Sequence, residues 1–464
     1  MSALTDLGVV EAAALLAQRE ITATELTAAC LDRIRTTDGN HSHDGDPQSI
    51  NAWVRVYEED AREAAARADD LLAAGGERPP LLGVPVGLKD LYEVAGKPIT
   101  ASSRALHDVP DEDCDVWQRL RAAGMILLGH LHTHEFAVGG TTDQVGNPCD
   151  LSRTAGGSSG GSAAALAARM VPAATGTDTA GSLRIPSACC GTASIKPTRG
   201  MVSTRGVVPL SWTLDHAGPM ARSLDDCRAL LAAMAGPDPG RAESALHATQ
   251  GARYESRATL AGARIALSPR VASVALDDDV TAGHAQMVDA CRALGATIIE
   301  PTAPTAGFTV DEPFLDVMTA DMLGYHRRFD GRRDLYRSSV REWVEMGEQR
   351  GVTGARYATI QAERRDLTAA WVAWLDEHRI TAVLEPTLPI VAPPRGDGYD
   401  SAGSDAVLIS LTHFWNWTGF PVVTFPTGVG SMTGLPVSAS LIGRGGQDWN
   451  LLALGGALEA QFRS

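Results

Sequence analysis

The stretch TAGGSSGGSAAALAARMVPAATGTDTAGSLRIP, which spans Thr154–Pro186, contains two clusters of Gly and Ser joined by an Ala-rich segment. The clusters lie at Gly156–Ser162 and Gly181–Ser182. Glycine lets the backbone approach other backbone or a ligand closely, at a cost in conformational entropy. This composition therefore predicts a site made by backbone amides and hydroxyl groups, with little side-chain bulk.

Helical and strand-like segments alternate on both sides of this stretch. Two helices are expected within 8–36, with Thr22 or Thr24 as the N-cap of the second, and others over 58–75, 113–124 and Ser162–Met170. Leu81–Leu88 reads as a buried strand or turn, and strand-like runs follow at Met125–Leu128, Arg264–Leu267, Thr297–Glu300, Thr381–Leu384 and Pro421–Phe425. This alternation predicts an α/β fold with a large mixed, mostly parallel-type sheet covered by helices on both faces.

The chain shows no repeat and no long low-complexity linker, so we expect a single domain over 1–464. Its expected parts are N-terminal helices over 1–75, the core that holds the Gly/Ser stretch over 76–235, a variable region over 236–380 with a helical insertion at 311–378, and closing strands and a helix over 381–464.

Composition and charge exclude several classes of protein. The chain has 464 residues, 44% of them hydrophobic, and a formal net charge of −16. This acidic balance disfavours nucleic acid and anionic membrane surfaces as partners. No window approaches about 18 uncharged apolar residues, and the N-terminus lacks the basic region of a signal peptide. The seven Cys include no CxxC spacing, which favours reduced thiols and a cytoplasmic protein.

Lysine is nearly absent: the 40 basic residues include only Lys89, Lys97 and Lys196. Arginine stays protonated, whereas a buried lysine can lose its proton. Lys89 lies in the apolar segment GVPVGLKDLY, so we expect it to be buried and functional. We expect Lys196 to be structural and Lys97 to be exposed.

The residues supply the parts needed for acyl transfer, which are an activated nucleophile, a base and donors to an oxyanion. Ser182 follows the small-residue turn 179–181, whose N–H groups could converge on one point. A neutral Lys89 could accept a proton from Ser182 through Ser158. The structural alternative is that these serines cap turns and pack tightly.

Three further motifs compete with this interpretation. The segments 156–160 and 157–161 match G-x-S-x-G, the nucleophile elbow of α/β-hydrolases, but that motif follows a strand and the preceding NPCDLSRTA reads as a loop. The Gly cluster lacks the G-K-[ST] ending of a phosphate-binding loop. His130, His132 and His134 alternate and would share one face of a strand, which leaves a metal site open although no partner carboxylates stand out.

Several segments resemble the amidase signature family. GVPVGLKD resembles its lysine motif, AGGSSGGSAAALAA its Gly/Ser cluster, and GTDTAGSLRIPSACCGTASIKPTRG its nucleophile segment. The C-terminal TGFPVVTFPTG and GLPVSASLIGR resemble its closing strands. The resemblance covers most of the chain and is weakest at 236–380.

This resemblance implies a role for each matching residue. Ser182 would be the nucleophile, Ser158 a bridging serine preceded by a cis peptide bond, and Lys89 the base. The backbone N–H groups of the oxyanion hole would belong to Thr179, Ala180, Gly181 and Ser182. Supporting groups would be Ser159, Asp178 and Arg184. Many family members have Gly where this chain has Ala180, and a Cβ there is tolerated only at backbone angles open to a non-glycine residue.

We expect pocket walls from three places: Phe136, Ala137, Val138 and Gly139; the helical insertion; and 411–417, which includes Trp415 and Trp417. These aromatic residues favour an apolar or aryl group on the substrate.

The expected function is hydrolysis of small or aryl amides through an acyl-enzyme on Ser182, extending to esters or carbamates, without a cofactor or metal. The partner would be a small-molecule substrate, and the enzyme a monomer or homodimer. The alternatives are a metallohydrolase built on the His cluster, a non-catalytic binding protein, and an ammonia-releasing amidotransferase A-type subunit.

Overall fold

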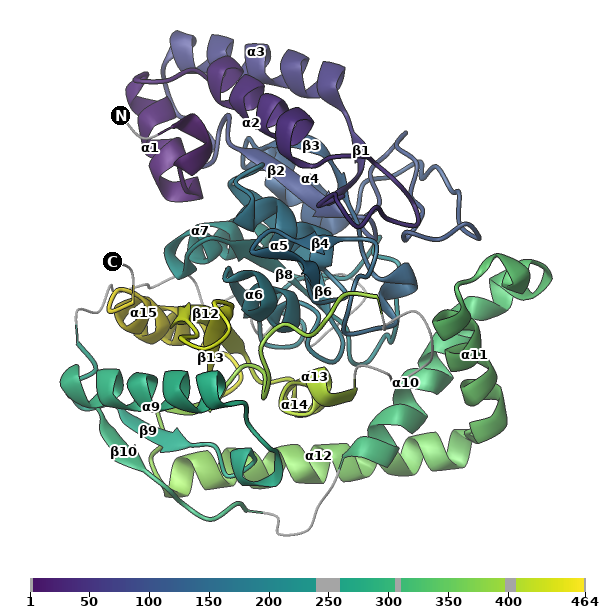
Figure 1. Ribbon diagram of the computed structural model, residues 1–464, viewed down its shortest axis with the longest axis vertical. Helices are drawn as coiled ribbons and strands as arrows, with labels where there is room; N and C mark the ends of the chain where they lie inside the picture. Colours follow the sequence, from purple (N-terminus) through teal and green to yellow (C-terminus); the bar gives the residue numbers. More distant parts are fainter. Residues whose placement is uncertain (1–2, 239–258, 305–309, 397–405, 463–464) are drawn as a thin grey trace.

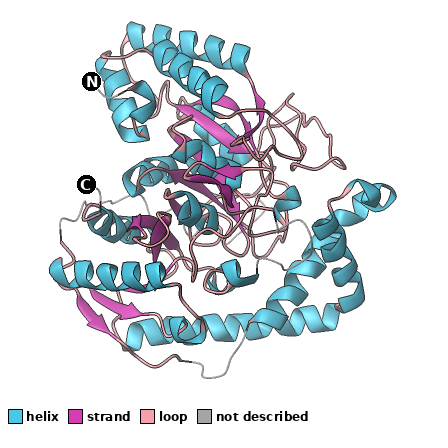
Figure 2. Cartoon of the chain, in the orientation of Figure 1, coloured by secondary structure: helices cyan, strands magenta, loops and turns pink. Residues whose placement is uncertain are grey.

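The computed structural model describes residues 3–238, 259–304, 310–396 and 406–462, and its centre is one sheet with helices around it (Figures 1 and 2). Within the described residues the sheet has eleven strands in the order β1-β3-β2-β6-β8-β7-β12-β13-β11-β9-β10. Its strands are β1 Trp53–Val56, β2 Pro85–Lys89, β3 Ile126–Leu131, β6 Ala173–Asp178, β7 Ala193–Lys196, β8 His216–Ala221, β9 Arg264–Leu267, β10 Thr297–Ile299, β11 Ala382–Pro386, β12 Val422–Val429 and β13 Pro436–Ile442.

The helices lie before, between and after these strands. They are α1 Val9–Gln18, α2 Ala23–Thr37, α3 Glu58–Ala74, α4 Asp115–Ala122, α5 Gly160–Ala167, α6 Arg184–Cys190, α7 Leu224–Met234, α9 Asp278–Ala293, α10 Asp311–His326, α11 Ser338–Arg350, α12 Gly354–Glu377, α13 Ala406–Ile409, α14 His413–Thr418 and α15 Asp448–Glu459. Short 3-10 segments are η1 Leu4–Asp6, η2 Glu135–Ala137, η3 Val271–Ser273 and η4 Arg327–Leu335.

Parallel pairing occurs near the two ends of the sheet, in β3-β2-β6 and in β11-β9-β10. The strands between these groups pair antiparallel, as does β1 at the edge. The predicted large mixed sheet with helices around it is confirmed, but the expectation of mostly parallel pairing holds only toward the ends. Antiparallel neighbours such as β12 and β13 need only a short connection, whereas parallel neighbours need a crossover.

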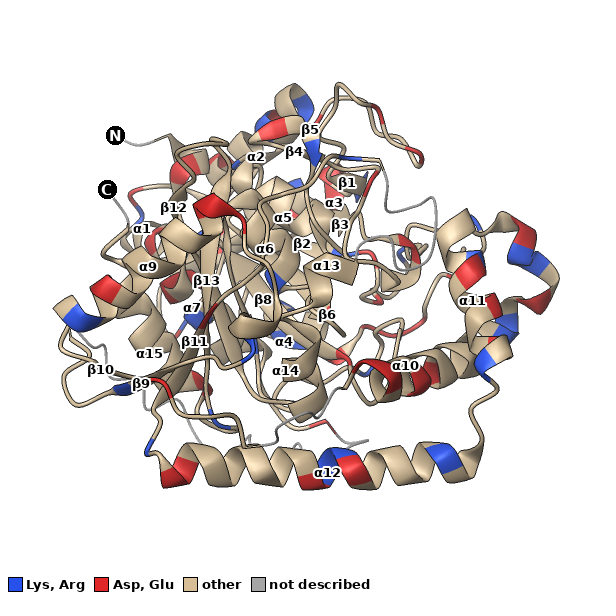
Figure 3. Ribbon diagram, turned by 60° about the horizontal axis from the view of Figure 1, so that its bottom comes forward, with Lys and Arg blue, Asp and Glu red and all other residues tan. Residues whose placement is uncertain are grey.

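The predicted helices form where their sequence signals lie. Thr22 caps α2 in a reciprocal capping box with Glu25. The insertion predicted at 311–378 is helical, and in Figure 1 α10, α11 and α12 form an arm along the outside of the sheet. Figure 3 shows acidic and basic residues interspersed along these outer helices, whereas most of the central ribbon carries no charge.

One loop prediction was wrong. Residues 150–154, inside NPCDLSRTA, form the strand β5 Asp150–Thr154, which pairs with β4 Gly146–Asn147 in a separate two-stranded ribbon. This ribbon lies outside the main sheet. Strand β5 does precede the first Gly/Ser cluster. A nucleophile elbow, however, follows a strand of the main sheet, and β5 is not one of its strands.

The buried apolar residues of the described chain form one large cluster and two smaller ones between the sheet and its helices. Gly455 of α15 packs closely on Val423 and Phe425 of β12, while Leu183, just before α6, lies against Gly176 and Gly218 in the two central strands β6 and β8. Among the described residues, no helix is both long and apolar enough to cross a membrane.

Candidate active site

Two neighbouring strands bring the predicted site residues to one edge of the sheet. β2 and β6 are parallel, with Val86 opposite Ala173 and Gly87 opposite Ala174. Lys89 ends β2 and Asp178 ends β6, so both lie at the carboxyl edge, where ligands bind in open α/β sheets. The turn 179–183 leads from β6 into α6.

Lys89 is fully buried and surrounded by hydroxyl groups. Its Nζ lies 2.7 Å from Ser158 Oγ, 2.8 Å from Thr177 Oγ1 and 2.9 Å from Ser159 Oγ. Ser159 donates its own proton to the Thr177 carbonyl at 3.3 Å, so its Oγ accepts from the amine. A neutral amine has two N–H groups and one lone pair, so the lone pair is available to a hydroxyl that donates, such as that of Ser158.

Burial holds the pKa of Lys89 well below its ordinary value. The carboxylates of Asp178 and Asp215 raise it, but neither forms an ion pair with the amine among the described residues. Removing a charge from water costs more than these distant attractions return. The site therefore favours the neutral amine, the form that can act as a base.

The two serine segments adjoin. The Ser159 N–H donates to the Ser182 carbonyl at 3.3 Å, which brings the start of α5 against the turn after β6. The Gly157–Ser158 peptide bond is cis, as the family resemblance implies. Gly157 leaves no room for a side chain, since an added Cβ would lie 2.0 Å from the Thr141 carbonyl oxygen. Ser158 is thereby presented to Lys89 from a tightly packed backbone.

The turn after β6 presents backbone amides. Within the described residues, no acceptor is paired with the N–H groups of Thr179, Ala180, Gly181 or Ser182. Gly181 has φ +143°, and a Cβ there would lie 2.4 Å from Thr412 Oγ1. Ala180 has no positive φ, which explains how the chain accommodates alanine at this position.

A buried ion pair fixes the turn from behind. The guanidinium of Arg184 binds both carboxylate oxygens of Asp178 at 2.9 Å, and the Leu183 N–H donates to the same carboxylate at 3.1 Å. Asn416 donates to the Asp178 carbonyl and carboxylate at 2.8 Å. Burial raises the pKa of Asp178, but Arg184 outweighs it and keeps the carboxyl ionised. The sequence reasoning missed Asn416, which lies 238 residues from Asp178 and carries no local signal.

An apolar cavity opens in front of the turn. It is lined by Ala137, Val138, Gly139, Gly140, Thr179, Ala180, Ser182, Leu210, Phe314, Leu315, Met318, Trp343 and Ile409. Three of the four predicted residues at 136–139 are among them, together with residues of α10 and α11 from the helical insertion. None of these lining side chains is charged.

Three predicted wall residues are placed elsewhere. Phe136 is fully buried behind the wall, with its ring 4.7 Å from that of His326. Trp415 donates to Glu385 at 2.5 Å, and Trp417 lies under the Arg364 guanidinium. Both tryptophans are fully buried in the core, because the short helix α14 turns them toward the sheet and α12 and away from the cavity.

Each histidine of the cluster is hydrogen-bonded to another group of the protein. His130 is hydrogen-bonded to Tyr57 at 2.8 Å, His132 to Ser102 at 3.0 Å, and His134 to the Thr141 carbonyl at 2.9 Å. Burial lowers the pKa of His132 and of His134 to about 3. The described part of the chain contains no group of three or more His, Cys, Asp or Glu that could hold a metal ion.

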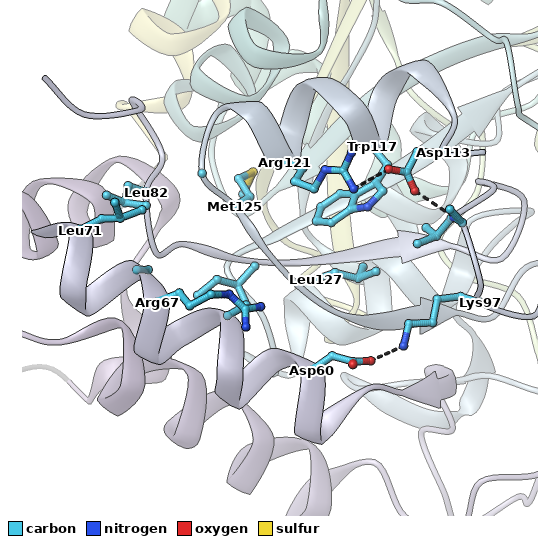
Figure 4. A pocket seen from close by; sticks show the side chains of 16 residues that line it. Asp60, Arg67, Leu71, Leu82, Lys97, Asp113, Trp117, Arg121, Met125 and Leu127 are labelled. Atoms are coloured by element: carbon cyan, nitrogen blue, oxygen red, sulfur yellow. Dashed lines mark hydrogen bonds and ion pairs between the residues drawn. The ribbon is translucent and has the colours of Figure 1, made fainter. Parts of the chain in front are cut away.

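A wider cavity, of about 450 Å³, lies between α3 and α4 (Figure 4). Its charged groups are paired, Lys97 with Asp60, Arg121 with Asp113 and Arg67 with Glu63, and no residue of the turn 179–183 lines it. Although this cavity is larger, none of Lys89, Ser158 and Ser182 lines it, whereas Ser182 lines the smaller cavity at the sheet edge. Lys97 is partly exposed at its rim.

Comparison with known proteins agrees with this geometry. The Amidase family profile matches residues 25–452. The chain belongs to the amidase signature family. It is 38% identical to an amidase of Pseudomonas putida, over 99% of this chain and 97% of the relative. It is also 33% identical to the A subunit of the glutamyl-tRNA(Gln) amidotransferase of Anaeromyxobacter dehalogenans (strain 2CP-C), with the same two coverages.

Solved structures give the same family. The structure of 6-aminohexanoate cyclic dimer hydrolase complexed with substrate matches with a TM-score of 0.84 and 26% identity, covering 99% of this chain and 98% of that chain. The protein is an amidase, an enzyme that hydrolyses carboxylic amide C–N bonds.

Proposed function

We propose that this amidase hydrolyses small apolar or aryl amides through an acyl-enzyme on Ser182, with Lys89 and Ser158 as the proton relay. The observation that carries the proposal is the buried amine of Lys89, whose Nζ lies 2.7 Å from Ser158 Oγ. The adjoining turn 179–182 has backbone amides with no acceptor among the described residues. No cofactor enters the proposed reaction.

The chemical steps follow from these positions. Ser182 Oγ attacks the amide carbonyl carbon while its proton passes to Ser158 and the Ser158 proton passes to Lys89. The N–H groups of residues 179–182 stabilise the resulting oxyanion. When the C–N bond breaks, the relay returns one proton to the leaving amine. Water then attacks the acyl-enzyme, and the same relay removes its proton and returns it to Ser182.

The lining of the cavity supports the substrate class. Leu210, Phe314, Met318 and Trp343 supply apolar area and no charge. An apolar or aryl acyl group gains from burial here, whereas a charged group would lose its hydration without a partner. Esters and carbamates present the same carbonyl to the same donors, so we extend the proposal to them.

A second candidate is an ammonia-releasing component of a larger complex, since the relatives include the A subunits of glutamyl-tRNA(Gln) amidotransferases. Glutamine carries an ammonium and a carboxylate next to its side chain, and the uncharged cavity offers neither a counter-ion. The apolar lining therefore favours the free-standing enzyme. We expect it to be a cytoplasmic monomer or homodimer.

The experiment is a substrate panel with wild type and Ser182→Ala. Anilides, aliphatic amides, aryl esters, carbamates and glutamine are compared side by side, with and without a chelator. We expect aryl amides to be turned over best, no effect of the chelator, and a loss of at least about 10⁴-fold in kcat for Ser182→Ala. A fluorophosphonate should label wild type on the peptide that contains Ser182. Near-normal turnover by Ser182→Ala contradicts the proposal, and glutamine as the best substrate favours the second candidate.

A further inference from the structure

Asp215 is a buried carboxylate with no part in the proposed reaction steps. It immediately precedes β8, whose first residue, His216, pairs with Asp178 at the end of β6. Because the two strands are antiparallel, Asp215 lies opposite Thr179, the first residue of the turn that presents the amides. The residue is 8% exposed.

The two oxygens of this carboxylate bind two different parts of the site. Thr179 Oγ1 donates to Oδ1 at 2.5 Å. The N–H groups of Leu210 and Ser211 donate to Oδ2 at 3.0 and 3.1 Å. Leu210 lines the apolar cavity. One carboxylate therefore ties the amide turn to the cavity wall with hydrogen bonds to an ionised acceptor, which are stronger than neutral ones.

The connection continues into the helical insertion. The Ser211 hydroxyl donates to Asp321 of α10 at 2.6 Å, and Tyr357 of α12 donates to the other Asp321 oxygen at 2.8 Å. Three residues of α10 also line the cavity: Phe314, Leu315 and Met318. Segment 210–211 thus has two connections. Asp215 links it to the amide turn, and Asp321 links it to α10, the helix that forms part of the apolar wall.

We propose that Asp215 is a positioning residue that holds the amide turn, through Thr179, in register with the substrate wall, through Leu210 and Ser211. The inference rests on the proposed function of Ser182 and Lys89 and adds a residue that touches neither substrate nor the reacting atoms. Without the hydrogen bond between Thr179 and Asp215, the amides of the turn move away from the oxyanion. Without the bonds from the Leu210 and Ser211 N–H groups to Asp215, the cavity wall loosens.

Asp215 also acts on the base at a distance. Its charge raises the pKa of Lys89, against the larger effect of burial. Burial raises the pKa of Asp215 itself to about 6, with a contribution from Asp321. Asp178 also raises the pKa of Lys89, the charge of Asp215 contributes to the raised pKa of Tyr92, and the charge of Lys89 contributes to the lowered pKa of His134. Replacing Asp215 by Asn therefore lowers the pKa of Lys89.

The test compares Asp215→Asn, Thr179→Val and Thr179→Ser with wild type. Asp448→Asn is the matched control, because Asp448 is a buried carboxylate that accepts from the N–H and the hydroxyl of Thr198 at 2.7 and 2.5 Å. We expect Asp215→Asn and Thr179→Val to lower kcat on an aryl amide by about 10- to 100-fold, less than the loss of a whole oxyanion donor. Thr179→Ser keeps the hydroxyl that donates to Asp215, so it should lose clearly less of kcat than Thr179→Val.

The pH profile separates positioning from mere support of the fold. In Asp215→Asn the acidic limb of kcat/KM should move to lower pH, because Lys89 then loses its proton more readily. In Asp448→Asn the limb should stay in place even if stability falls by a similar amount. The inference is overturned if Thr179→Val keeps normal kcat, if Thr179→Ser is as impaired as Thr179→Val, or if the limb does not move in Asp215→Asn. Should Asp215→Asn not fold, the two Thr179 variants decide the matter.

Failure of the proposed function gives a different result. If Ser182→Ala retains turnover, Ser182 is not the nucleophile, whatever the Asp215 variants do. If Ser182→Ala is inactive while the Thr179 and Asp215 variants behave as wild type, only the positioning role of Asp215 is wrong.

Discussion

Lys89 and Lys196 are both fully buried, and burial holds the pKa of each well below the ordinary value for lysine. They differ in their partners. Lys89 is bound by three hydroxyl groups, whereas Lys196 donates to the backbone carbonyls of Phe420 at 2.6 Å and Pro197 at 3.3 Å. A hydroxyl can donate and accept a proton, and a carbonyl only accepts hydrogen bonds. Burial lowers the pKa of both lysines, but only a hydroxyl partner can pass a proton to the amine in a relay.

The largest expected difference is in turnover. Lys89→Met should lower kcat by about 10³- to 10⁴-fold, near the upper range for loss of a general base. Lys196→Met should cost less than about tenfold, because Lys196 donates to the backbone carbonyls of Phe420 and Pro197, neither of which lies in the amide turn. Steady-state kinetics on an aryl amide measures both, with circular dichroism to show that each variant is folded. Equal losses in two folded variants would contradict the distinction between the lysines.

The hydroxyl partners give the next largest effect. Ser158→Ala removes the hydroxyl that is bonded to Lys89 and is proposed to relay the proton of Ser182, so it should lower kcat by about 10²- to 10³-fold. Ser162→Ala is a matched control in the same segment, since Ser162 is buried and donates to the Thr175 carbonyl at 2.8 Å without contacting Lys89. Its kcat should stay within about threefold of wild type. If the control loses as much as Ser158→Ala, packing and not proton relay accounts for the effect.

The pH profile sharpens the comparison further. Because the reaction needs neutral Lys89, kcat/KM should rise with pH up to an apparent pKa well below the ordinary value for lysine and then level off. Lys196→Met should leave this limb in place. If Lys196→Met shifts the acidic limb of kcat/KM, or if kcat/KM keeps rising into the pH range where an exposed lysine titrates, a group other than Lys89 is the base.

The smallest expected effect concerns stability, and here the two lysines should behave alike. A folded-state pKa below the unfolded value means that the unfolded chain binds more protons, so each lysine makes the free energy of unfolding rise with pH up to about 10.4. The slope is at most about 1.4 kcal/mol per pH unit for each group. Denaturant unfolding between about pH 7 and 9 should show a shallower slope in Lys89→Met and in Lys196→Met. An unchanged slope in either would mean that the lysine is charged in the folded protein.

The sequence predicted the parts of the site that carry local signals. Lys89 stood out because the chain has so few lysines, and Ser158 and Ser182 because glycines surround them. The N-cap expected at Thr22 or Thr24 and the helical pattern of the insertion likewise depend on neighbouring residues; the structure places the cap at Thr22 and confirms the helices. The roles of the site residues remain predictions.

The parts of the fold and of the site that the sequence did not predict depend on contacts between distant segments. Strand β6, with the sequence AATGTD, lacks the β-branched and aromatic run typical of a strand, so its place beside β2 was not predicted. Asp215 and Asn416 reach the turn only through the sheet register and the position of α14. Trp415 and Trp417 were assigned to the pocket because aromatic residues serve cores and pockets equally well, and only packing decides between them.

Lysine-selective ¹³Cε labelling with NMR titration tests most directly whether Lys89 is the neutral base, since the chain has only three lysines. The variants Lys89→Met and Lys196→Met assign the signals. We expect the Lys89 signal to titrate with the same apparent pKa as the acidic limb of kcat/KM and to show the neutral amine at the pH of full activity. A Lys89 signal that stays in the charged form throughout the active pH range would contradict a neutral base at this position.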